Sequence, residues 1–314
     1  MDHSTPHRDA PSTRAPGALL TPKPSKPTEP FGIGTPARVF RWPGAKWHAC
    51  EALAPRLREH LDATGGRLLS LFHGAGALEQ TVASTTLIAA DANPDLRVLY
   101  AELARDGGAE AFHELVKLDD LGAPRPRREF ARIRAINPQA MSPAARAARF
   151  LWLSGLAFNG IWRVNREGLL NVPPDARRLE HPWPFPVRSE LAAAARGAPS
   201  VPLFDDWRRV IDLAQPGDLI LSDPPYLSGF NSYTQGRFTL AEQHLLAIAL
   251  RGRALAGCAV VAFNSADAHP LYRSWANIEP ISRPGRMNCR PSRRGPVGEL
   301  LATIGLHGQG PQTP

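Results

Sequence analysis

Residues 67–80 read "RLLSLFHGAGALEQ", a short apolar run that passes directly into a turn containing Gly74 and Gly76. An apolar run of this length without polar alternation is typical of a strand buried on both faces of a parallel sheet. Glycine has no Cβ, so the turn lets a ligand approach the backbone closely. The dinucleotide fingerprint has a small residue where this chain has Glu79, and a tight turn without a ligand is the alternative interpretation.

The same strand pattern recurs along the chain, and helical patterns separate several of the strands. Apolar runs occupy residues 67–72, 85–91, 218–223 and 258–264, and helical periodicity covers residues 93–105 and 239–255. Strands that alternate with helices indicate an α/β fold whose sheet is covered on both faces. We therefore expect a doubly wound, mostly parallel sheet.

Residues 106–199 interrupt this alternation with Arg-rich, Pro-punctuated and helical segments. We interpret them as an insertion between two parts of one sheet domain, residues 37–105 and 200–306. The ends of the chain, residues 1–36 and 307–314, are rich in Pro and polar residues and have no apolar periodicity. Such segments cannot bury enough surface to offset the loss of chain entropy, so we expect disordered tails.

The composition favours a basic protein that attracts polyanions. Among 314 residues, 37 Lys and Arg stand against 29 Asp and Glu, which gives a formal net charge of +8. Nucleic acid is a reasonable partner for this charge, and a surface that only confers solubility is the alternative. Three widely separated cysteines indicate neither a disulfide framework nor a zinc site. Because no membrane-length apolar run and no secretory signal are present, we expect a cytoplasmic protein.

Polar residues near the glycine turn indicate a cofactor. Asp91 ends the apolar run at 85–91, where a carboxylate can accept hydrogen bonds from ribose hydroxyls, although it could instead cap a helix that begins near Pro94. Upstream, Trp42 and Lys46 flank another glycine turn and offer an aromatic wall and a cation, with a plain surface turn as the alternative. Together these features predict a cofactor that contains a nucleoside.

The stretch "LILSDPPYLSGF", residues 219–230, ends a buried strand with Asp223, two prolines and Tyr226. Pro224 and Pro225 lack an N–H, so the loop offers carbonyl and carboxylate acceptors but few donors. Such a loop suits a ligand with N–H donors, such as the exocyclic amine of a nucleobase, and Tyr226 offers a ring on which the base can stack. The alternative is an Asp cap followed by a proline turn.

In this order, the motifs resemble those of the S-adenosylmethionine-dependent DNA adenine-N6 methyltransferases, over most of residues 38–304. "RWPGAKW" resembles the N-terminal cofactor motif, "LFHGAGALEQ" the F-x-G-x-G motif, and residues 223–226 the catalytic tetrapeptide D-P-P-Y. "AFNGIWRVNREGLLNVP" resembles the family's F-N-G-x-x-R-x-N segment, and "RRGPVGELLATIG" its closing strand. Two departures stand out: Ala45 replaces a usual second glycine, and Ser70-Leu71 replace a common Glu-Pro.

The resemblance implies a Rossmann-like methyltransferase fold, with residues 106–199 as a helical target-recognition insertion and S-adenosylmethionine as the cofactor. The residues implied to bind this cofactor are Trp42, Lys46, Phe72, Gly74, Gly76, Asp91 and Asp206, with Asp205 as a competing alignment for Asp206. The residues implied to act on a flipped-out adenine, without a metal, are Asp223, Pro224, Pro225 and Tyr226. Ala45 is expected to be tolerated unless its position needs a positive φ.

The basic residues of the insertion are candidates for DNA contact, because arginine binds phosphate and guanine and asparagine suits adenine. These candidates are Asn159, Arg163, Asn165, Arg166, Arg177 and Arg178, with Trp183 and the basic segment 125–130 nearby. A second basic cluster consists of Arg283, Arg286, Arg290, Arg293 and Arg294. For any one of these arginines, a solvated surface position is the alternative.

Several functions remain open at this point. One alternative is an N4-cytosine DNA methyltransferase, which needs the same acceptors, and another is a methyltransferase that acts on RNA. A third is a DNA-binding relative with an inactive cofactor site. A nicotinamide enzyme is disfavoured by Glu79 in the glycine motif and by the D-P-P-Y loop. We expect a monomer that modifies double-stranded DNA within a specific short sequence, with or without a companion restriction nuclease.

Overall fold

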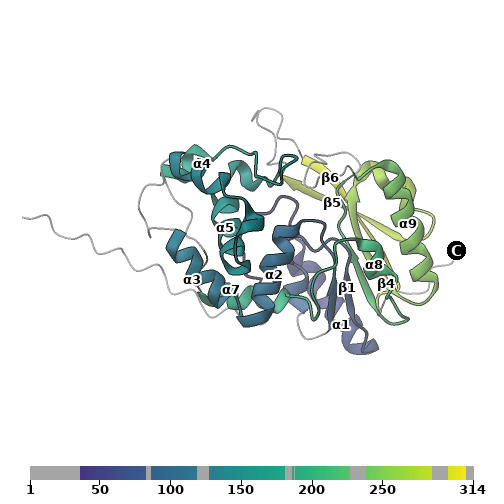
Figure 1. Ribbon diagram of the computed structural model, residues 1–314. Coiled ribbons are helices and arrows are strands. Elements are labelled where there is room, and N and C mark those ends of the chain that lie inside the picture. The colour runs from purple at the N-terminus through teal and green to yellow at the C-terminus, as the bar shows by residue number, and fades with distance from the viewer. Residues whose placement is uncertain are drawn as a thin grey trace, which may run out of the picture. The chain divides into compact units, whose positions relative to one another are not determined.

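The computed structural model in Figure 1 describes residues 36–82, 86–118, 127–180, 186, 188–226, 238–284 and 296–308, without the side chains of 282–284, 296 and 297. All of these residues belong to one unit of mutually contacting chain, Phe31–Pro314. The predicted tails lie outside the described residues, apart from Pro36, His307 and Gly308.

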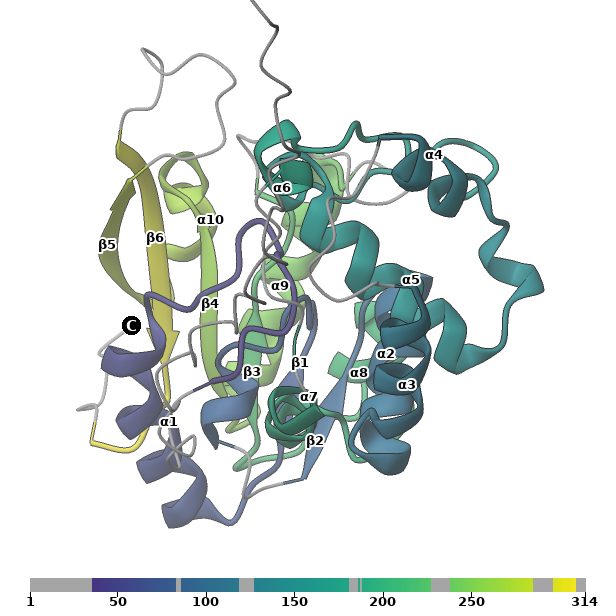
Figure 2. The same ribbon diagram turned by 90° about the vertical axis from the view of Figure 1, so that its left-hand side faces the viewer.

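Within the described residues, six strands form one mixed sheet in the order β2-β1-β3-β4-β6-β5 (Figure 2). The strands are β1 Leu68–Ser70, β2 Leu87–Ala89, β3 Leu219–Ser222, β4 Ala259–Ser265, β5 Asn277–Pro284 and β6 Pro296–Ile304. β1, β2, β3 and β4 are parallel to one another, whereas β6 is antiparallel to both β4 and β5. The predicted mostly parallel α/β sheet is confirmed, and each predicted apolar run coincides with one of the parallel strands to within a few residues.

Alternate side chains of the parallel strands point to opposite faces of the sheet, and each face has its own apolar core. In β3, Leu219 and Leu221 face one core and Ile220 faces the other. Residues of α1 Cys50–Thr64 and α2 Pro94–Asp106 belong to the first core. Residues of α8 Trp207–Ile211, α9 Leu240–Leu255 and α10 His269–Tyr272 belong to the second. Helices therefore cover both faces, as a doubly wound fold requires.

Between β2 and β3 the chain forms a group of helices that packs against α2 (Figure 1). They are α3 Ala109–Leu118, α4 Arg127–Ala135, α5 Pro143–Leu156, α6 Ala176–Glu180 and α7 Arg188–Ala194. α5 is central to the group, because it contacts both α2 and α3 and fully buries Phe150, Trp152 and Leu153. The apolar stretch at residues 150–158 forms the carboxyl half of α5 and the turn after it.

Short 3₁₀ turns complete the described structure. They are η1 Glu79–Val82, η2 Pro138–Ala140, η3 Phe158–Gly160, η4 Ala195–Gly197 and η5 Ala266–Ala268. No helix within the described ranges is long and apolar enough to cross a membrane.

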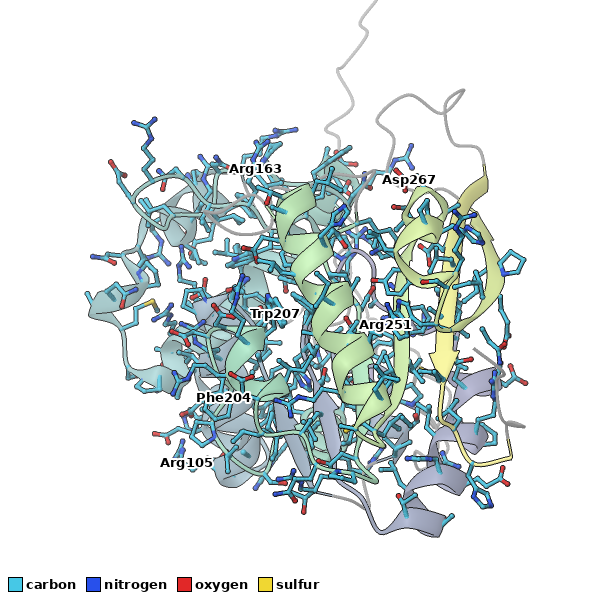
Figure 3. The ribbon with its side chains drawn as sticks, turned by 90° about the vertical axis from the view of Figure 1, so that its right-hand side faces the viewer. Arg105, Arg163, Phe204, Trp207, Arg251 and Asp267 are labelled. Atoms are coloured by element: carbon cyan, nitrogen blue, oxygen red, sulfur yellow. The ribbon has the colours of Figure 1, made fainter. Side chains whose placement is uncertain are left out.

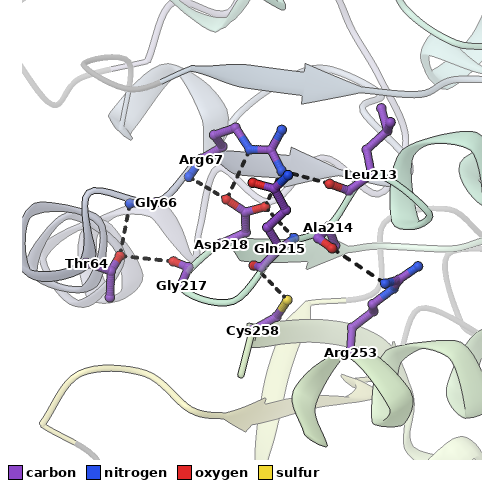
Figure 4. A network of polar contacts seen from close by, with 10 residues as sticks. All are labelled: Thr64, Gly66, Arg67, Leu213, Ala214, Gln215, Gly217, Asp218, Arg253 and Cys258. Atoms are coloured by element: carbon purple, nitrogen blue, oxygen red, sulfur yellow. Dashed lines mark hydrogen bonds and ion pairs between the residues drawn. The ribbon is translucent and has the colours of Figure 1, made fainter. Parts of the chain in front are cut away.

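A polar cluster around Arg67 and Asp218 ties together the amino ends of β1 and β3 (Figure 4). Asp218 Oδ1 accepts hydrogen bonds from Arg67 N at 2.8 Å and from Arg67 Nε at 3.2 Å, and Asp218 Oδ2 accepts one from Arg67 Nη2 at 2.6 Å. Burial by itself would raise the pKa of Asp218, but the hydrogen bonds from Arg67 outweigh it and lower the pKa. The cluster therefore fixes the register of β1 against β3.

The carboxyl ends of the four parallel strands meet at the other edge of the sheet. β1 leads into the glycine turn, β2 into Asp91, β3 into Asp223 and β4 into η5. In open α/β sheets, ligands bind at this edge. The fold therefore brings together motifs that lie far apart in the sequence.

Candidate active site at the carboxyl edge of the sheet

The turn after β1 needs both of its glycines. Gly74 and Gly76 have φ of 53° and 60°, a region that side chains disfavour. A Cβ on Gly76 would lie 2.9 Å from the Tyr100 hydroxyl, and one on Gly74 would lie 3.1 Å from Trp42 Nε1. Trp42 therefore lies against the turn, so the two predicted cofactor motifs are neighbours in space.

Asp91 is fixed to the glycine turn by backbone hydrogen bonds. Its Oδ2 accepts from Gly74 N and its Oδ1 from Asn93 N, both at 2.8 Å. The side chain of Asn93 caps α2 by accepting from the backbone of Asp95 and Leu96, so the alternative interpretation of Asp91 as the cap is wrong. Burial raises the pKa of Asp91 above its ordinary value.

Glu79 explains why the glycine motif departs from its usual pattern. The side chain is buried, and it accepts a 2.6 Å hydrogen bond from Ser70 Oγ and lies 3.6 Å from His73 Nδ1. Burial by itself would raise the pKa of Glu79, but the contact with His73 outweighs it and lowers the pKa. Ser70, one of the three residues that depart from the family pattern, thus donates a hydrogen bond to a carboxylate beneath the turn.

Lys46 connects the N-terminal motif to the D-P-P-Y loop. Its side chain is buried, and its Nζ donates to Asp223 Oδ2 at 2.7 Å and to the Gly44 carbonyl at 2.6 Å. The ammonium also lies 5.1 Å from the ring centroids of both Tyr226 and Phe263. Lys46 is predicted from the sequence as a cofactor residue, but its contact with Asp223 is not.

The first departure from the family pattern causes no backbone strain. Among the described residues, Asn159 alone has a positive φ without being glycine, so Ala45 does not need a positive φ. Gly44 takes the positive φ of the turn, at 84°. The expectation that Ala45 is tolerated is therefore confirmed for the backbone.

The D-P-P-Y loop is also held from the other face of the sheet. Gln243 of α9 donates from Nε2 to the Pro225 carbonyl at 2.7 Å. Gln243 is in turn bonded to Asn264 of β4, and both side chains are fully buried. Neither residue is among those predicted from the sequence, although a Gln on the apolar face of a helix is a signal that could identify Gln243.

Asp206 lies at the start of α8 and caps it, accepting from Arg208 N at 2.9 Å. Arg208 also bridges Asp206, at 3.2 Å, and Glu242 of α9, at 2.6 Å. The neighbouring Asp205 is exposed and paired with Arg209 at 3.3 Å. A bridge between Phe204 and Ala90 places this segment directly beside the end of β2.

Phe72 is the last predicted cofactor residue, and it lies next to the Asp206 segment. Its ring is 6.4 Å from the ring of Trp207 and 5.5 Å from that of Phe238. All seven predicted cofactor residues therefore lie along the ends of β1, β2 and β3 or in segments that contact them. Within the described ranges, no group of three or more His, Cys, Asp or Glu side chains could hold a metal ion.

The predicted DNA residues of the insertion form a separate group around a hairpin. Val164 bridges Leu170, and the tight turn between them exposes Arg166. The Asn165 amide oxygen accepts from the backbone N of Glu167 and Leu169, so it stabilises this turn. Arg163 Nε donates to Asn171 Oδ1 at 2.7 Å.

Asn159 and α6 lie on either side of this hairpin in the sequence. Asn159 has a φ of 54°, and its Nδ2 is buried without a hydrogen-bond partner among the described residues. Arg177 and Arg178 lie in α6, where Arg177 is exposed. The predicted residues that lie outside the described structure are Arg125, Trp183, Arg286, Arg290, Arg293, Arg294 and the side chain of Arg283.

Comparison with known families identifies the chain. Residues 42–283, well over half of its length, match the family described as D12 class N6 adenine-specific DNA methyltransferase. The chain belongs to this family. The match begins at Trp42 and includes the glycine turn, Asp91 and the whole D-P-P-Y loop.

Curated relatives carry matching names. The chain is 28% identical to a DNA N-6-adenine-methyltransferase of Escherichia phage P1, over 85% of this chain and 35% of the phage protein. It therefore spans about a third of the length of that relative. It is 28% identical to the retron Ec67 DNA adenine methylase of Escherichia coli, over 76% of this chain and 81% of that protein. It is 26% identical to a Type II methyltransferase of Lactococcus lactis subsp. cremoris, over 84% of this chain and 93% of that protein.

Proposed function

We propose that this methyltransferase transfers the methyl group of S-adenosylmethionine to N6 of an adenine within a specific short sequence of double-stranded DNA. The observation that carries the proposal is the ion pair between Lys46 and Asp223, which joins the N-terminal cofactor motif to the loop of amine acceptors. The family is described as N6 adenine-specific DNA methyltransferases, which disfavours the N4-cytosine, RNA and nicotinamide alternatives. The intact D-P-P-Y tetrapeptide disfavours the inactive alternative.

The residues at the glycine turn fit S-adenosylmethionine. A side chain on Gly74 or Gly76 would fill the space beside Trp42 and Tyr100, so the turn is open to a ligand only because of its glycines. Asp91, held by two backbone N–H groups, presents its carboxylate to ribose hydroxyls, and Asp206 would receive the adenine amine. When bound, this cofactor supplies an electrophilic methyl group on a sulfonium.

The acceptors of the D-P-P-Y loop explain how the target amine becomes nucleophilic. The lone pair of N6 is delocalised into the adenine ring, and two acceptors that engage both of its hydrogens favour the form with a localised lone pair. Asp223 and the Pro224 carbonyl would be these acceptors, and Tyr226 would stack on the extruded base. The Lys46 ammonium fixes the Asp223 carboxylate as an acceptor, so catalysis depends on positioning, and the amine loses its proton after transfer.

DNA would bind along the insertion, residues 106–199, as the target-recognition region. Exposed Arg166 and Arg177 are placed to contact phosphates or guanine edges. Arg163, Arg178 and Asn159 would contribute nearby, and Asn165 would act by shaping the hairpin that presents Arg166.

A single chain would carry out the reaction, because Lys46 joins the cofactor motif to the Asp223 loop within the chain. The relative from Lactococcus lactis is named a Type II methyltransferase, which supports a role in restriction–modification. A companion nuclease would then cut the unmethylated form of the same DNA sequence.

The test is to incubate the protein with DNA and S-adenosylmethionine labelled on its methyl group, and to digest the DNA to nucleosides. Label in N6-methyldeoxyadenosine is the expected result. Label in N4-methyldeoxycytidine, or retained DNA binding without any transfer, would contradict the proposal.

A further inference from the structure

We propose that Gln243, Asn264 and Tyr272 are positioning residues, which hold the backbone of the D-P-P-Y loop in the orientation that methyl transfer requires. The inference rests on the proposed function, because it concerns the same loop. Gln243 lies in the family-like stretch that follows the D-P-P-Y loop, but none of the three residues is among the predicted site residues.

The three side chains form a continuous buried path that ends on the loop. Gln243 Nε2 donates to the Pro225 carbonyl at 2.7 Å, and Asn264 Nδ2 donates to Gln243 Oε1 at 2.9 Å. Asn264 Nδ2 also lies 3.4 Å from the Tyr272 hydroxyl, and all three residues are fully buried. Because α9, β4 and α10 contribute one residue each, the path ties three elements to the catalytic loop.

Backbone groups at both ends fix the direction of every hydrogen bond in the path. The backbone N–H of Ser265 can only donate, and it donates to Asn264 Oδ1 at 2.9 Å. The Asn264 amino group must then face Gln243 Oε1, which turns the Gln243 amino group toward Pro225. The Pro225 carbonyl can only accept a hydrogen bond and therefore requires a donor. The amide orientations that follow from the Ser265 N–H place the Gln243 amino group there as this donor.

The location of Gln243 argues against a role in stability alone. The other buried residues of α9 are Leu246, Ala247 and Leu250, and the surrounding core is apolar. A hydrogen-bonded amide in an apolar core stabilises the fold little more than an apolar side chain of the same shape would. It destabilises the fold if any of its hydrogen bonds is missing. A specific partner, the Pro225 carbonyl, accounts for its presence there.

The two prolines make one fixed carbonyl sufficient to orient the loop. A proline ring fixes φ, so the remaining freedom of Pro225 is its ψ, which turns its carbonyl and sets the direction of the chain into Tyr226. Gln243 holds this carbonyl from the α9 face, while Lys46 holds Asp223 from the other face. The Pro224 carbonyl lies between these two fixed points and keeps its direction toward the target amine.

The test compares Gln243→Met and Asn264→Asp with wild type in steady-state methylation of DNA. Gln243→Met keeps the length and apolar packing of the side chain but leaves the Pro225 carbonyl without its donor. In Asn264→Asp the carboxylate turns the Gln243 amide around, so that Gln243 Oε1 faces the Pro225 carbonyl. We expect kcat to fall about 10- to 100-fold in both variants, because a misplaced reacting group lowers the rate of the chemical step. The KM for S-adenosylmethionine and the Kd for DNA should change less than about twofold.

Asp218→Asn is the matched control, because it disturbs a buried polar cluster at the other end of the same strands (Figure 4). It should lower the melting temperature and leave kcat unchanged. A folded Gln243→Met with kcat within about twofold of wild type would overturn the inference, as would a loss of kcat in Asp218→Asn equal to that in Gln243→Met. Wild-type protein that transfers no methyl group to adenine would instead contradict the proposed function, and this inference with it.

Discussion

Lys46 shows how one side chain can join two distant motifs. It lies 177 residues before Asp223 in the chain, yet its ammonium is 2.7 Å from that carboxylate and is almost completely buried. Removing the charge leaves Asp223 without this anchor, although Asp223 itself is 29% exposed and partly solvated. The contact therefore bears on the orientation of the carboxylate more than on global stability.

Replacing Lys46 with Met should lower the rate of methyl transfer about 10- to 100-fold, since a charge-assisted hydrogen bond to the acceptor loop is lost. The rate is measured in single-turnover assays at saturating cofactor and DNA. Lys117→Met is the control, because Lys117 is an exposed lysine in a pair with Glu114 on α3. If both variants methylated DNA at the wild-type rate, the assigned role of Lys46 would be wrong.

Gly76 offers a second test at the residue scale. In Gly76→Ala the new Cβ would meet the Tyr100 hydroxyl at 2.9 Å in a backbone with a φ of 60°. The turn must shift, so we expect the affinity for S-adenosylmethionine to fall about tenfold or more and the free energy of unfolding to fall by about 1 kcal/mol. Calorimetric titration measures the first and chemical unfolding the second.

Gly252→Ala is the control for this substitution. Gly252 lies inside α9, and a Cβ added there would meet no atom within 4 Å. Alanine should therefore stabilise the helix by about 1 kcal/mol and leave cofactor binding unchanged. Wild-type cofactor affinity in Gly76→Ala would show that the turn does not contact the cofactor.

Residue roles could be predicted from the sequence only where a local pattern carries them. The acceptor character of Asp223 and the openness of the glycine turn follow from residue types alone. The contacts of Lys46 and Gln243 with the loop depend on which elements become neighbours, so one sequence without a fold could not supply them. Asp91 was open to two interpretations, because Asn93 is an equally good cap and only the geometry identifies which residue caps α2.

Among the elements, the parallel strands were the easiest to predict and β5 the hardest. β1 to β4 are apolar runs buried on both faces, which is a strong signal. β5 reads "NIEPISRP", and its two prolines argue against a central strand. The sheet order places β5 at an edge, where a proline without an N–H is tolerated.

The Arg67–Asp218 cluster at the junction of β1 and β3 makes the free energy of unfolding depend on pH. Because the folded-state pKa of Asp218 is lowered from its ordinary value of 3.8, the ionised carboxylate stabilises the fold above that pH. This contribution is lost as the pH falls below 3.8 through the lower folded-state pKa. Asp218→Asn should therefore lower the free energy of unfolding at pH 7, by about 1–3 kcal/mol for hydrogen bonds to a charged group.

Urea unfolding of wild type and Asp218→Asn at a series of pH values checks this prediction. The difference between the two proteins should be largest near neutral pH and should shrink as the pH falls below 3.8. A difference that stays constant down to acid pH would contradict the assignment.

At the scale of the whole molecule, the parallel strands decide where the site lies. Their carboxyl ends share one edge, so the order of strands and turns in the sequence was enough to predict that the motifs converge. The same reasoning cannot give the recognised DNA sequence, because readout depends on side-chain geometry in the insertion, where the chain follows no regular alternation.

The distribution of arginines makes the DNA-binding proposal testable. Arg163 of the insertion lies toward the top of Figure 3, as does Asp267 of η5, which follows β4. Arg251 lies lower in the same view, on α9. Arg166→Ala should weaken DNA binding and reduce the slope of log K against log salt concentration by about 1, as the loss of one phosphate contact does. Fluorescence anisotropy across a salt series measures both quantities.

Arg251→Ala removes an exposed arginine of α9 and serves as the control, with wild-type affinity and slope expected. Equal losses of affinity in Arg166→Ala and Arg251→Ala would mean that DNA binding depends on net charge alone, and the insertion would not be the recognition region.

We propose that the D-P-P-Y loop performs its chemistry through the acceptors of Asp223. The most direct measurement is the single-turnover rate of methyl transfer to adenine N6 for wild type and Asp223→Ala, with cofactor and DNA both saturating. We predict that Asp223→Ala still binds S-adenosylmethionine and loses about 10²- to 10³-fold or more in rate, as the removal of an oriented catalytic group does. Transfer by Asp223→Ala at the wild-type rate would contradict the account.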